Sequence, residues 1–235
     1  MFNYEIDQVQ LAITTDLCSC DIVVTMTLLF SSLFVAFICF HFGSANQLIN
    51  LSDADKQSAV DVHNHYRIEA GATAMQKLKW NNQIAEFSQR AVSQCKFDHT
   101  TWDDRQNVAG FKFIGENIYT VSGPAMDQPT VKTAVDDWAS EQKDFDLNSN
   151  SCSAMCGHYT QIVWANTTDV GCAISQCDSI QGFGSDAGYL IFCNYGIGGN
   201  MIGEKPFEKA GTSAEIGSKC QDTFSNQPDA NGLCG

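Results

Sequence analysis

The chain reads GHYTQIVWANT at residues 157–167 and LIFCNYGIGGN at residues 190–200. The first stretch contains a short run rich in β-branched and aromatic residues at 160–165, and the second overlaps such a run at 189–195. Such runs are typical of strands when Gly, Asn, Asp and Ser separate them. Similar runs occur at 113–121 and 172–176. We therefore expect four short strands that form an antiparallel sheet.

The first half of the chain predicts helices. Ser52, followed three residues later by Asp55, resembles a capping box, and a run without Gly or Pro follows, so we expect a first helix at 53–70. A second helix is expected at 81–95, where apolar residues recur at helical spacing. Its apolar stripe ends in Cys95, which should therefore point toward the core.

A third helix is expected after Pro129, and Glu141 falls at the rim of its apolar face. A carboxylate in that position must be hydrogen-bonded, paired, or turned toward water or a cavity, and the helical pattern leaves these alternatives open. Because helices come first and strands mostly later, the fold class is α+β. The expected apolar face of this third helix consists of Val131, Ala134, Val135, Trp138 and Phe145.

The first 45 residues differ in character from the rest of the chain. Residues 1–25 form an acidic extension, and an apolar run at 22–42 leads into Gly43-Ser44-Ala45, small residues at the spacing of a signal peptidase site. We expect a signal peptide at 26–45 that is cleaved after Ala45, with Met26 as an alternative start. The run is also long enough to be a signal anchor that spans a bilayer.

Cysteine usage agrees with export to the extracellular space. Three of the eleven cysteines precede the expected cleavage site, and the other eight follow it. An even number in an exported chain predicts a disulfide framework, although spacing does not fix the pairing. A zinc ribbon is the disfavoured alternative, because paired CxxC motifs are absent. Sequons at Asn50 and Asn166 are candidate glycosylation sites.

The formal net charge of −14 disfavours two classes of partner. Such an acidic surface repels phosphate backbones and anionic lipid head groups. We therefore expect no nucleic-acid partner, and no stable membrane insertion once the signal is cleaved.

The two stretches quoted first resemble signatures of the CAP superfamily, which comprises cysteine-rich secretory proteins, antigen 5 venom allergens and plant pathogenesis-related proteins. The likeness covers about residues 53–200 and is greatest to the venom-allergen-like secreted proteins of nematodes. It departs at Ile197, where the family usually has proline. Further matching motifs are His63-Asn64 with Arg67, Gly115-Glu116-Asn117, and Trp138-Ala-Ser-Glu141.

The resemblance implies an α-β-α sandwich, with a small antiparallel sheet between helical layers. It places a CAP domain at 46–206, and the polar composition after Asn200, with Cys220 and Cys234, predicts a disulfide-stapled tail at 207–235. The resemblance also implies a pairing of the cysteines. Loss of the bridge between Cys95 and Cys177 should prevent folding, whereas loss of the bridge between Cys220 and Cys234 should have a mild effect on stability. The implied bridges are Cys95 with Cys177, Cys152 with Cys156, and Cys172 with Cys193, which leaves Cys220 with Cys234.

The family's cleft holds two histidines and two acids, which correspond here to His99, Glu116, Glu141 and His158. Two neutral imidazoles oriented by carboxylates can hold a zinc-like ion, although two protein ligands make a weak site. We expect weak zinc binding by His99 and His158 that fades below about pH 6.5. For His63, on the first expected helix, a packing or capping role is expected.

Two functions follow from this cleft. The favoured one is a secreted binding or effector protein that holds a small apolar ligand, such as a sterol or fatty acid, or an extracellular protein. No catalytic residue is assigned, because Ser153 and Thr160 have no activating base by spacing and every mature cysteine is expected to be bridged. The alternative is a hydrolase in which zinc or a glutamate activates water. Channel or protease inhibition is disfavoured, because only two cysteines follow Cys193.

Overall fold

The computed structural model describes residues 46–123 and 127–235, so the expected acidic extension at 1–25 and the whole of the expected signal segment at 26–45 lie outside the described residues. Within the described part, no helix has both the length and the apolar character needed to cross a membrane. The elements in chain order are β1 (Gln47–Ile49), α1 (Asp53–Ala70), β2 (Lys79–Trp80), α2 (Asn82–Val92), β3 (Gln106–Val108), β4 (Phe111–Phe113), β5 (Gly115–Ser122), α3 (Val131–Ala139), η1 (Ser140–Asp144), β6 (Phe145–Asp146), β7 (Ser151–Cys152), α4 (Gly157–Ile162), β8 (Asp169–Cys177), β9 (Gly188–Gly196), η2 (Ser213–Glu215) and α5 (Cys220–Phe224).

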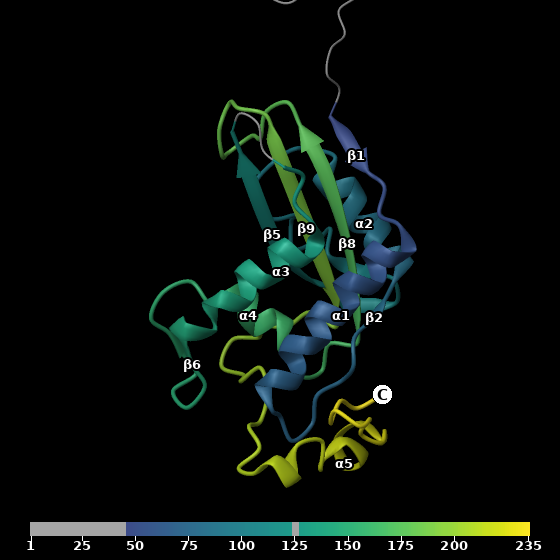
Figure 1. The fold of residues 1–235 in the computed structure, drawn as a ribbon, viewed down its shortest axis with the longest axis vertical. Coiled ribbons are helices and arrows are strands. Elements are labelled where there is room, and N and C mark those ends of the chain that lie inside the picture. The colour runs from purple at the N-terminus through teal and green to yellow at the C-terminus, as the bar shows by residue number, and fades with distance from the viewer. Residues whose placement is uncertain (1–45, 124–126) are drawn as a thin grey trace, which may run out of the picture. The chain divides into compact units, whose positions relative to one another are not determined.

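The central sheet has the strand order β1-β8-β9-β5, and all of these neighbours are antiparallel (Figure 1). The two residues of β2 add a short parallel pairing beside β8. In the β8–β9 pair, Cys172 lies directly opposite Cys193, and these two residues form a disulfide. The expected antiparallel sheet is therefore confirmed.

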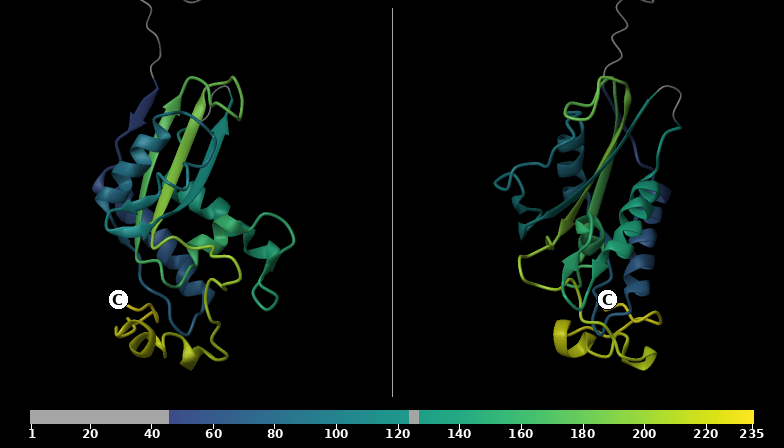
Figure 2. Two further views of the ribbon diagram at one scale, coloured as in Figure 1. Left: turned by 180° about the vertical axis from the view of Figure 1, so that it is seen from behind. Right: turned by 90° about the vertical axis from the view of Figure 1, so that its left-hand side faces the viewer.

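Helices cover both faces of this sheet. Seen edge-on, α2 lies on one side of the strands, and α1 and α3 lie on the other (Figure 2). Each face buries its own apolar cluster, which is how a sheet with two apolar faces is stabilised. The α-β-α sandwich is thus confirmed. The cluster under α2 contains Ala91, Val92, Cys95, Ile118, Ala173, Cys177, Ile180, Leu190 and Phe192, and the larger cluster on the other face includes Val62, Met75, Trp138, Ile162, Ile174 and Ile191.

The first helix has the expected bounds because its caps are encoded locally. The Ser52 side chain accepts a hydrogen bond from the Asp55 N–H, and the Asp55 carboxylate accepts one from the Ser52 N–H. At the other end, Gly71 has a φ of 62°, a left-handed conformation that glycine adopts without a Cβ penalty.

Two helices are shorter than expected. α2 ends at Val92, and the left-handed backbone of Cys95, with a φ of 50°, turns the chain while the sulfur stays buried as expected. The third helix ends at Ala139, because the Ser140 hydroxyl donates to the Asp137 carbonyl oxygen and a 3₁₀ turn follows. Glu141 therefore lies on that turn and Phe145 lies on a strand, so the expectation of one continuous apolar face is wrong.

The expected strand at 160–165 is also wrong. Residues Gly157–Ile162 form helix α4, and a turn follows it. A short buried apolar run does not show by periodicity whether it is strand or helix. The carbonyl oxygens of Ile162 and Trp164 both accept hydrogen bonds from the Arg67 guanidinium, about 95 residues earlier in the chain. The expected strand at 113–121 is divided, because β4 pairs with β3 whereas β5 joins the central sheet.

Four disulfides join the eight cysteines of the described region, in the same pairs that the resemblance implies. Cys95–Cys177 connects the loop after α2 to the end of β8. The tail at 207–235 packs onto the loop after α1, where the Cys234 N–H donates to the Met75 carbonyl oxygen at 2.7 Å. The tail also adds Leu233 to the larger core. The other bridges are Cys152–Cys156, Cys172–Cys193 and Cys220–Cys234.

Candidate functional site

The first histidine of the expected tetrad is held by a buried carboxylate. His99 follows α2 and its side chain is 54% exposed, whereas the Glu116 side chain on β5 is fully buried. The two meet at 2.9 Å between His99 Nδ1 and Glu116 Oε1. Glu116 also accepts hydrogen bonds from the N–H and hydroxyl of Thr100, at 2.9 and 2.8 Å, and from the Asn194 amide at 3.1 Å.

These contacts keep Glu116 ionised. Burial raises the pKa of its carboxyl, but the hydrogen bonds that it accepts outweigh burial and hold the pKa below its usual value. The largest of these effects comes from His99, followed by Asn194 and Thr100. A buried carboxylate is thus presented to His99 as a fixed negative partner.

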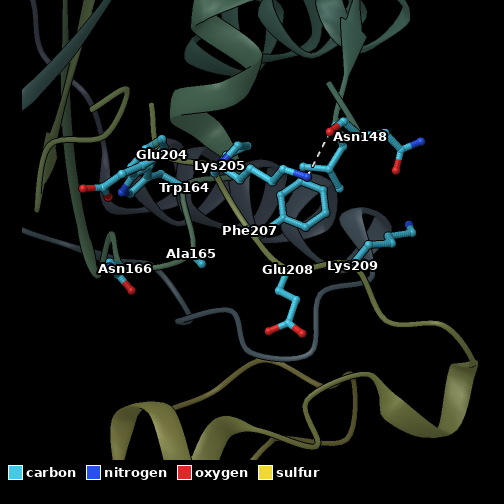
Figure 3. Close-up of a pocket in the computed structure, with 11 residues that line it drawn as sticks. Asn148, Trp164, Ala165, Asn166, Glu204, Lys205, Phe207, Glu208 and Lys209 are labelled. Atoms are coloured by element: carbon cyan, nitrogen blue, oxygen red, sulfur yellow. Dashed lines mark hydrogen bonds between the residues drawn. The ribbon is translucent and has the colours of Figure 1, made fainter. Parts of the chain in front are cut away.

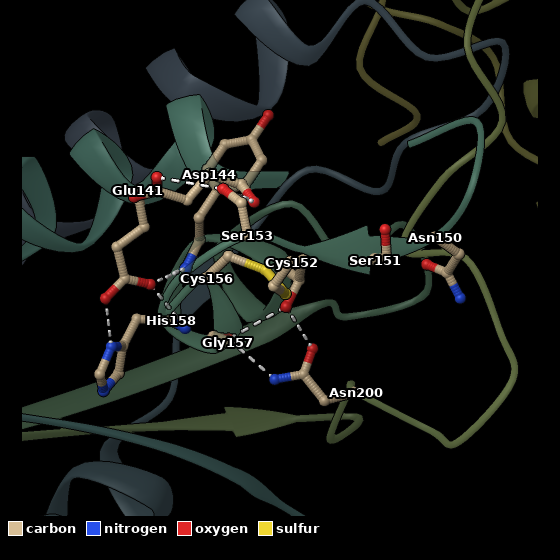
Figure 4. Close-up of a disulfide and its surroundings, with 12 residues drawn as sticks. Glu141, Asp144, Asn150, Ser151, Cys152, Ser153, Cys156, Gly157, His158 and Asn200 are labelled. Carbon is tan, nitrogen blue, oxygen red and sulfur yellow. Dashed lines mark hydrogen bonds and ion pairs between the residues drawn. A yellow bond between two sulfur atoms is a disulfide. The ribbon is translucent and has the colours of Figure 1, made fainter. Parts of the chain in front are cut away.

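The second histidine is held in the same way from the other face of the sheet. His158 Nδ1 lies 2.6 Å from Glu141 Oε1, and the other oxygen of Glu141 accepts the backbone N–H groups of His158 and Tyr159 at 3.0 and 3.2 Å (Figure 4). The Trp138 ring stacks on the imidazole with centroids 5.8 Å apart. Glu141 is therefore hydrogen-bonded, which is one of the alternatives expected for a carboxylate at the rim of the third helix.

The two pairs leave one nitrogen of each imidazole available. A carboxylate only accepts, so in the neutral ring Nδ1 carries the proton and Nε2 carries the lone pair. Within the described residues, neither Nε2 atom has a hydrogen-bond partner. This is the carboxylate–histidine arrangement that orients metal ligands in many proteins.

His99 and His158 line one cavity of about 430 Å³, whereas Glu141 is not part of its wall. Glu116 and Asn200 contribute to its polar part, and Asn200 is anchored by donating to the Gly157 carbonyl oxygen at 2.8 Å. Its other lining residues are Phe97, Asp98, Asn117, Ile118, Met155 and Gly157.

The donor set suits a weakly bound metal and does not form a closed metal cage. Among the described residues, no three His, Cys, Asp or Glu side chains converge closely enough to hold an ion. Two imidazole nitrogens remain as protein ligands, so water or a bound molecule would have to complete the coordination of a zinc ion.

A buried chain of hydrogen bonds connects this cleft to α1. His63 Nδ1 faces the Ala59 carbonyl oxygen at 2.7 Å, so Nδ1 carries the proton and Nε2 accepts from the Tyr195 hydroxyl at 2.9 Å. The Tyr195 oxygen accepts from the Asn117 amide at 3.2 Å, and the same amide donates to the His158 carbonyl oxygen at 3.1 Å. His63 therefore has a packing role, and its two hydrogen bonds fix the tautomer that carries the proton on Nδ1.

We expect the stability of the protein to fall between about pH 6.5 and pH 4 because of His63. Burial, helped by the nearby charge of Arg67, lowers the pKa of His63 to about 4. The unfolded chain takes up a proton at His63 below about pH 6.5 and the folded protein does not, so acid favours unfolding by up to about 1.4 kcal/mol per pH unit. Thermal unfolding of the wild type and His63→Gln from pH 7 to pH 4 measures this slope, which should be shallower in the variant.

The matched control is His65→Gln, because His65 lies on the same helix and is exposed. It should keep the wild-type slope. A wild-type slope in His63→Gln would contradict the assignment.

Three further residues belong to the site and could not be assigned to it from the sequence, namely Thr100, Asn194 and Trp138. Asn194 and Trp138 lie within quoted motifs, but only tertiary contacts show that they support Glu116 and His158. No sequence signal singles out Thr100. The candidate glycosylation sites Asn50 and Asn166 are both exposed, and their modification stays a prediction.

A separate cavity of about 360 Å³ contains no member of the tetrad. Lys205 crosses it and donates to the Asn148 carbonyl oxygen at 3.1 Å (Figure 3). Apart from the sequon residue Asn166, none of the predicted site residues lines it.

Comparison with known proteins shows a family match and several similar proteins. The sequence model of the "Cysteine-rich secretory protein family" (CAP) matches residues 60–195. GLIPR1-like protein 1 of Mus musculus is 36% identical over 170 residues, which cover 70% of this chain and 69% of that protein. Venom allergen 5 of Microctonus hyperodae is 33% identical, with 67% of this chain and 72% of that protein covered. Peptidase inhibitor 16 of Bos taurus is 32% identical over 74% of this chain, but the match spans only 36% of the bovine protein.

Solved structures show the same fold. Venom allergen-like protein 4 of Schistosoma mansoni is 28% identical and has a TM-score of 0.57, with 70% of this chain and 99% of that chain covered. A structure of NaASP2 with Zn²⁺ is 26% identical and has a TM-score of 0.59, with 79% of this chain and 97% of that chain covered. The expected likeness to venom-allergen-like proteins is confirmed.

Proposed function

Because the chain belongs to the cysteine-rich secretory protein (CAP) family, we propose that it is a secreted binding protein whose cleft holds a divalent metal ion weakly and a small apolar ligand beside it. The observation that carries this proposal is the pair of His–Glu contacts at 2.9 and 2.6 Å, which turn both Nε2 lone pairs away from the carboxylates. Zinc is the metal of choice, because neutral imidazole is a good zinc ligand.

The state of the carboxylates favours binding over hydrolysis. A general base needs an oxygen within reach of a water molecule and free to take its proton. The Glu116 oxygens accept four hydrogen bonds and are buried, and the Glu141 oxygens accept three. Both groups are thus occupied in orienting imidazoles, which supports a holding role. The alternative remains a zinc- or Glu-assisted hydrolase.

The apolar part of the cavity supports a ligand besides the metal. Phe97, Ile118 and Met155 line it next to the histidines, and the Met155 side chain is largely exposed. An apolar wall with a few polar groups is the usual composition of a small-molecule site. A sterol, a fatty acid or an apolar side chain of a partner protein would bury this wall.

Secretion is supported by the disulfides, because such bridges persist in oxidising compartments. Four of them are present in the described region. Relatives carry the names peptidase inhibitor and venom allergen, and one solved structure contains Zn²⁺. We therefore propose that this cleft binds a metal as well. We do not propose an inhibitory activity, because the match spans only about a third of the bovine inhibitor's length.

Zinc is expected to bind the wild type with an affinity at least about tenfold higher than it binds His99→Ala or His158→Ala, because each variant removes one of only two protein ligands. Calorimetric titration with zinc chloride at pH 7.5 measures these affinities. The affinity should fall at pH 5.5, where protons compete with zinc for imidazole nitrogen.

The matched control is His65→Ala, which removes an exposed histidine on α1 that lies outside the cleft. It should bind zinc like the wild type. Equal affinity of the wild type and both cleft variants would rule the site out. Turnover of a peptide or ester panel that disappears in Glu116→Gln would overturn the binding function in favour of the hydrolase.

A further inference from the structure

Another cavity, of about 310 Å³, adjoins the metal cleft and differs from it in containing an arginine. It shares His99, Glu116 and Asn200 with the first cavity, so these residues form the boundary between the two. Arg105 and the Trp102 ring contribute a cation and an aromatic surface to it. Its other lining residues are Phe113, Gly115, Gln161, Gly199 and Met201.

Besides His99 Nε2 of the metal site, Arg105 is the group in this cavity whose hydrogen-bonding capacity is unused. Within the described residues, its side chain forms no hydrogen bond or ion pair, and its Nε is the one buried side-chain polar atom without a partner. The neighbouring acids form hydrogen bonds with other residues: the Asp103 carboxylate accepts one from the Gln106 amide, and the Asp104 carboxylate accepts one from the Thr101 hydroxyl. In a chain of net charge −14, a guanidinium without an acidic partner needs an explanation.

Apart from His99 Nε2, which belongs to the metal site, the other polar groups of the cavity form hydrogen bonds within the protein. Gln161 accepts from the Gly199 N–H at 2.8 Å, and Asn200 accepts from the Thr160 hydroxyl at 2.7 Å. The Glu116 carboxylate takes hydrogen bonds from residues behind the cavity wall, including Asn194. These groups shape the cavity, and the terminal nitrogens of Arg105, which unlike Nε are not buried, remain available to a bound molecule.

The guanidinium is held in place by aromatic stacking. It lies over the Phe113 ring at 5.1 Å, and the Trp102 ring stacks on the same phenylalanine with centroids 3.9 Å apart. Cation–π contact positions an arginine and leaves its N–H edge free to donate. Because Trp102 is 54% exposed and Met201 is 45% exposed, the mouth of the cavity offers apolar surface beside the charge.

We propose that this cavity binds a carboxylate attached to a flat apolar body, with the carboxylate on Arg105 and the flat body against Trp102 and Met201. Arginine pairs with carboxylates through two parallel N–H donors, and such charge-assisted bonds are the stronger ones. The negative charge of Glu116 faces His99 and Thr100, so it does not occupy the arginine. The proposal deepens the binding function of the same cleft but requires no metal.

The test uses naphthalene-2-carboxylate as probe and naphthalene-2-carboxamide as its uncharged analogue, both in the presence of EDTA. The shift of the Trp102 indole N–H signal in NMR titrations reports binding at this cavity. The carboxylate should bind the wild type at least about tenfold more tightly than the carboxamide. Arg105→Met should bind both probes equally, and Arg105→Lys should retain part of the preference. Trp102→Ala lacks the reporter signal, so its affinities are measured by calorimetric titration, and they should be lower for both probes.

The matched control is Arg90→Met, because Arg90 also lies over an aromatic ring, that of Phe87, but is exposed on α2 outside the cavity. It should keep the wild-type preference. A peptide ending in a free phenylalanine carboxylate, compared with its amidated form, distinguishes a protein C-terminus from a free organic acid as the source. No preference for carboxylate in either pair, or an unchanged preference in Arg105→Met, would overturn the proposal, whereas loss of zinc binding would not affect it.

Discussion

Replacement of Arg67 by leucine is expected to lower the free energy of unfolding by more than about 4 kcal/mol, a large part of the roughly 5–15 kcal/mol that stabilises an ordinary domain. The Arg67 side chain is 1% exposed and its guanidinium donates six hydrogen bonds to backbone carbonyl oxygens. Burial lowers its pKa to about 9, so it remains charged at pH 7.

The cost is large because the acceptors cannot find other partners. They belong to two separate segments, the loop after α1 at Gln76 and the turn after α4 at 162–167. Leucine would leave buried carbonyl oxygens without donors, and each such group costs about 1–3 kcal/mol. The turn after α4 would then lose its attachment to α1, and His158 on α4 would be displaced.

Circular dichroism during urea and thermal unfolding of purified Arg67→Leu tests this expectation. Arg67→Lys is the informative second variant, because an ammonium keeps the charge but has only three donors, and it should be intermediate. Arg90→Leu, which removes an exposed arginine, should unfold like the wild type. A stability loss in Arg67→Leu no greater than that of Arg90→Leu would show that the buried network is dispensable.

The second large effect is expected from removal of the Cys95–Cys177 bridge. These cysteines are 82 residues apart, and a bridge that closes such a loop stabilises a protein by about 4 kcal/mol in the chain-entropy account. Both sulfurs lie in the apolar cluster under α2, and in the described region this is the one covalent connection between the chain at the end of α2 and the sheet. Cys95→Ala with Cys177→Ala should therefore fail to fold or melt at a much lower temperature.

The matched control is Cys220→Ala with Cys234→Ala. This bridge closes 14 residues, for which the chain-entropy term is smaller by about 1–2 kcal/mol. It connects residues within the tail, so its loss should loosen 207–235 and leave zinc binding in the cleft unchanged. Thermal unfolding combined with amide hydrogen exchange separates global from local loss. Equal melting temperatures of the two double variants would contradict the different roles assigned to these bridges.

Features governed by neighbours in sequence were predictable. α1 has its expected bounds because Ser52, Asp55 and Gly71 cap it through contacts within a few residues. β8 and β9 were expected from their apolar, β-branched and aromatic composition. In each case the deciding interaction is local, so it is present in the order of the residues.

Features governed by residues far apart in sequence were not predictable. The run at 160–165 is helical and turn-like, where its carbonyl oxygens meet Arg67, and Glu141 leaves the helical stripe to accept the N–H groups of α4. The unpartnered state of Arg105 likewise follows from which groups its neighbours engage. The sequence supplies the donors, acceptors and apolar side chains of these sites. Their pairing emerges only when the sheet and both helical layers exclude water, because a buried polar group must then bond with whatever the packing brings within reach.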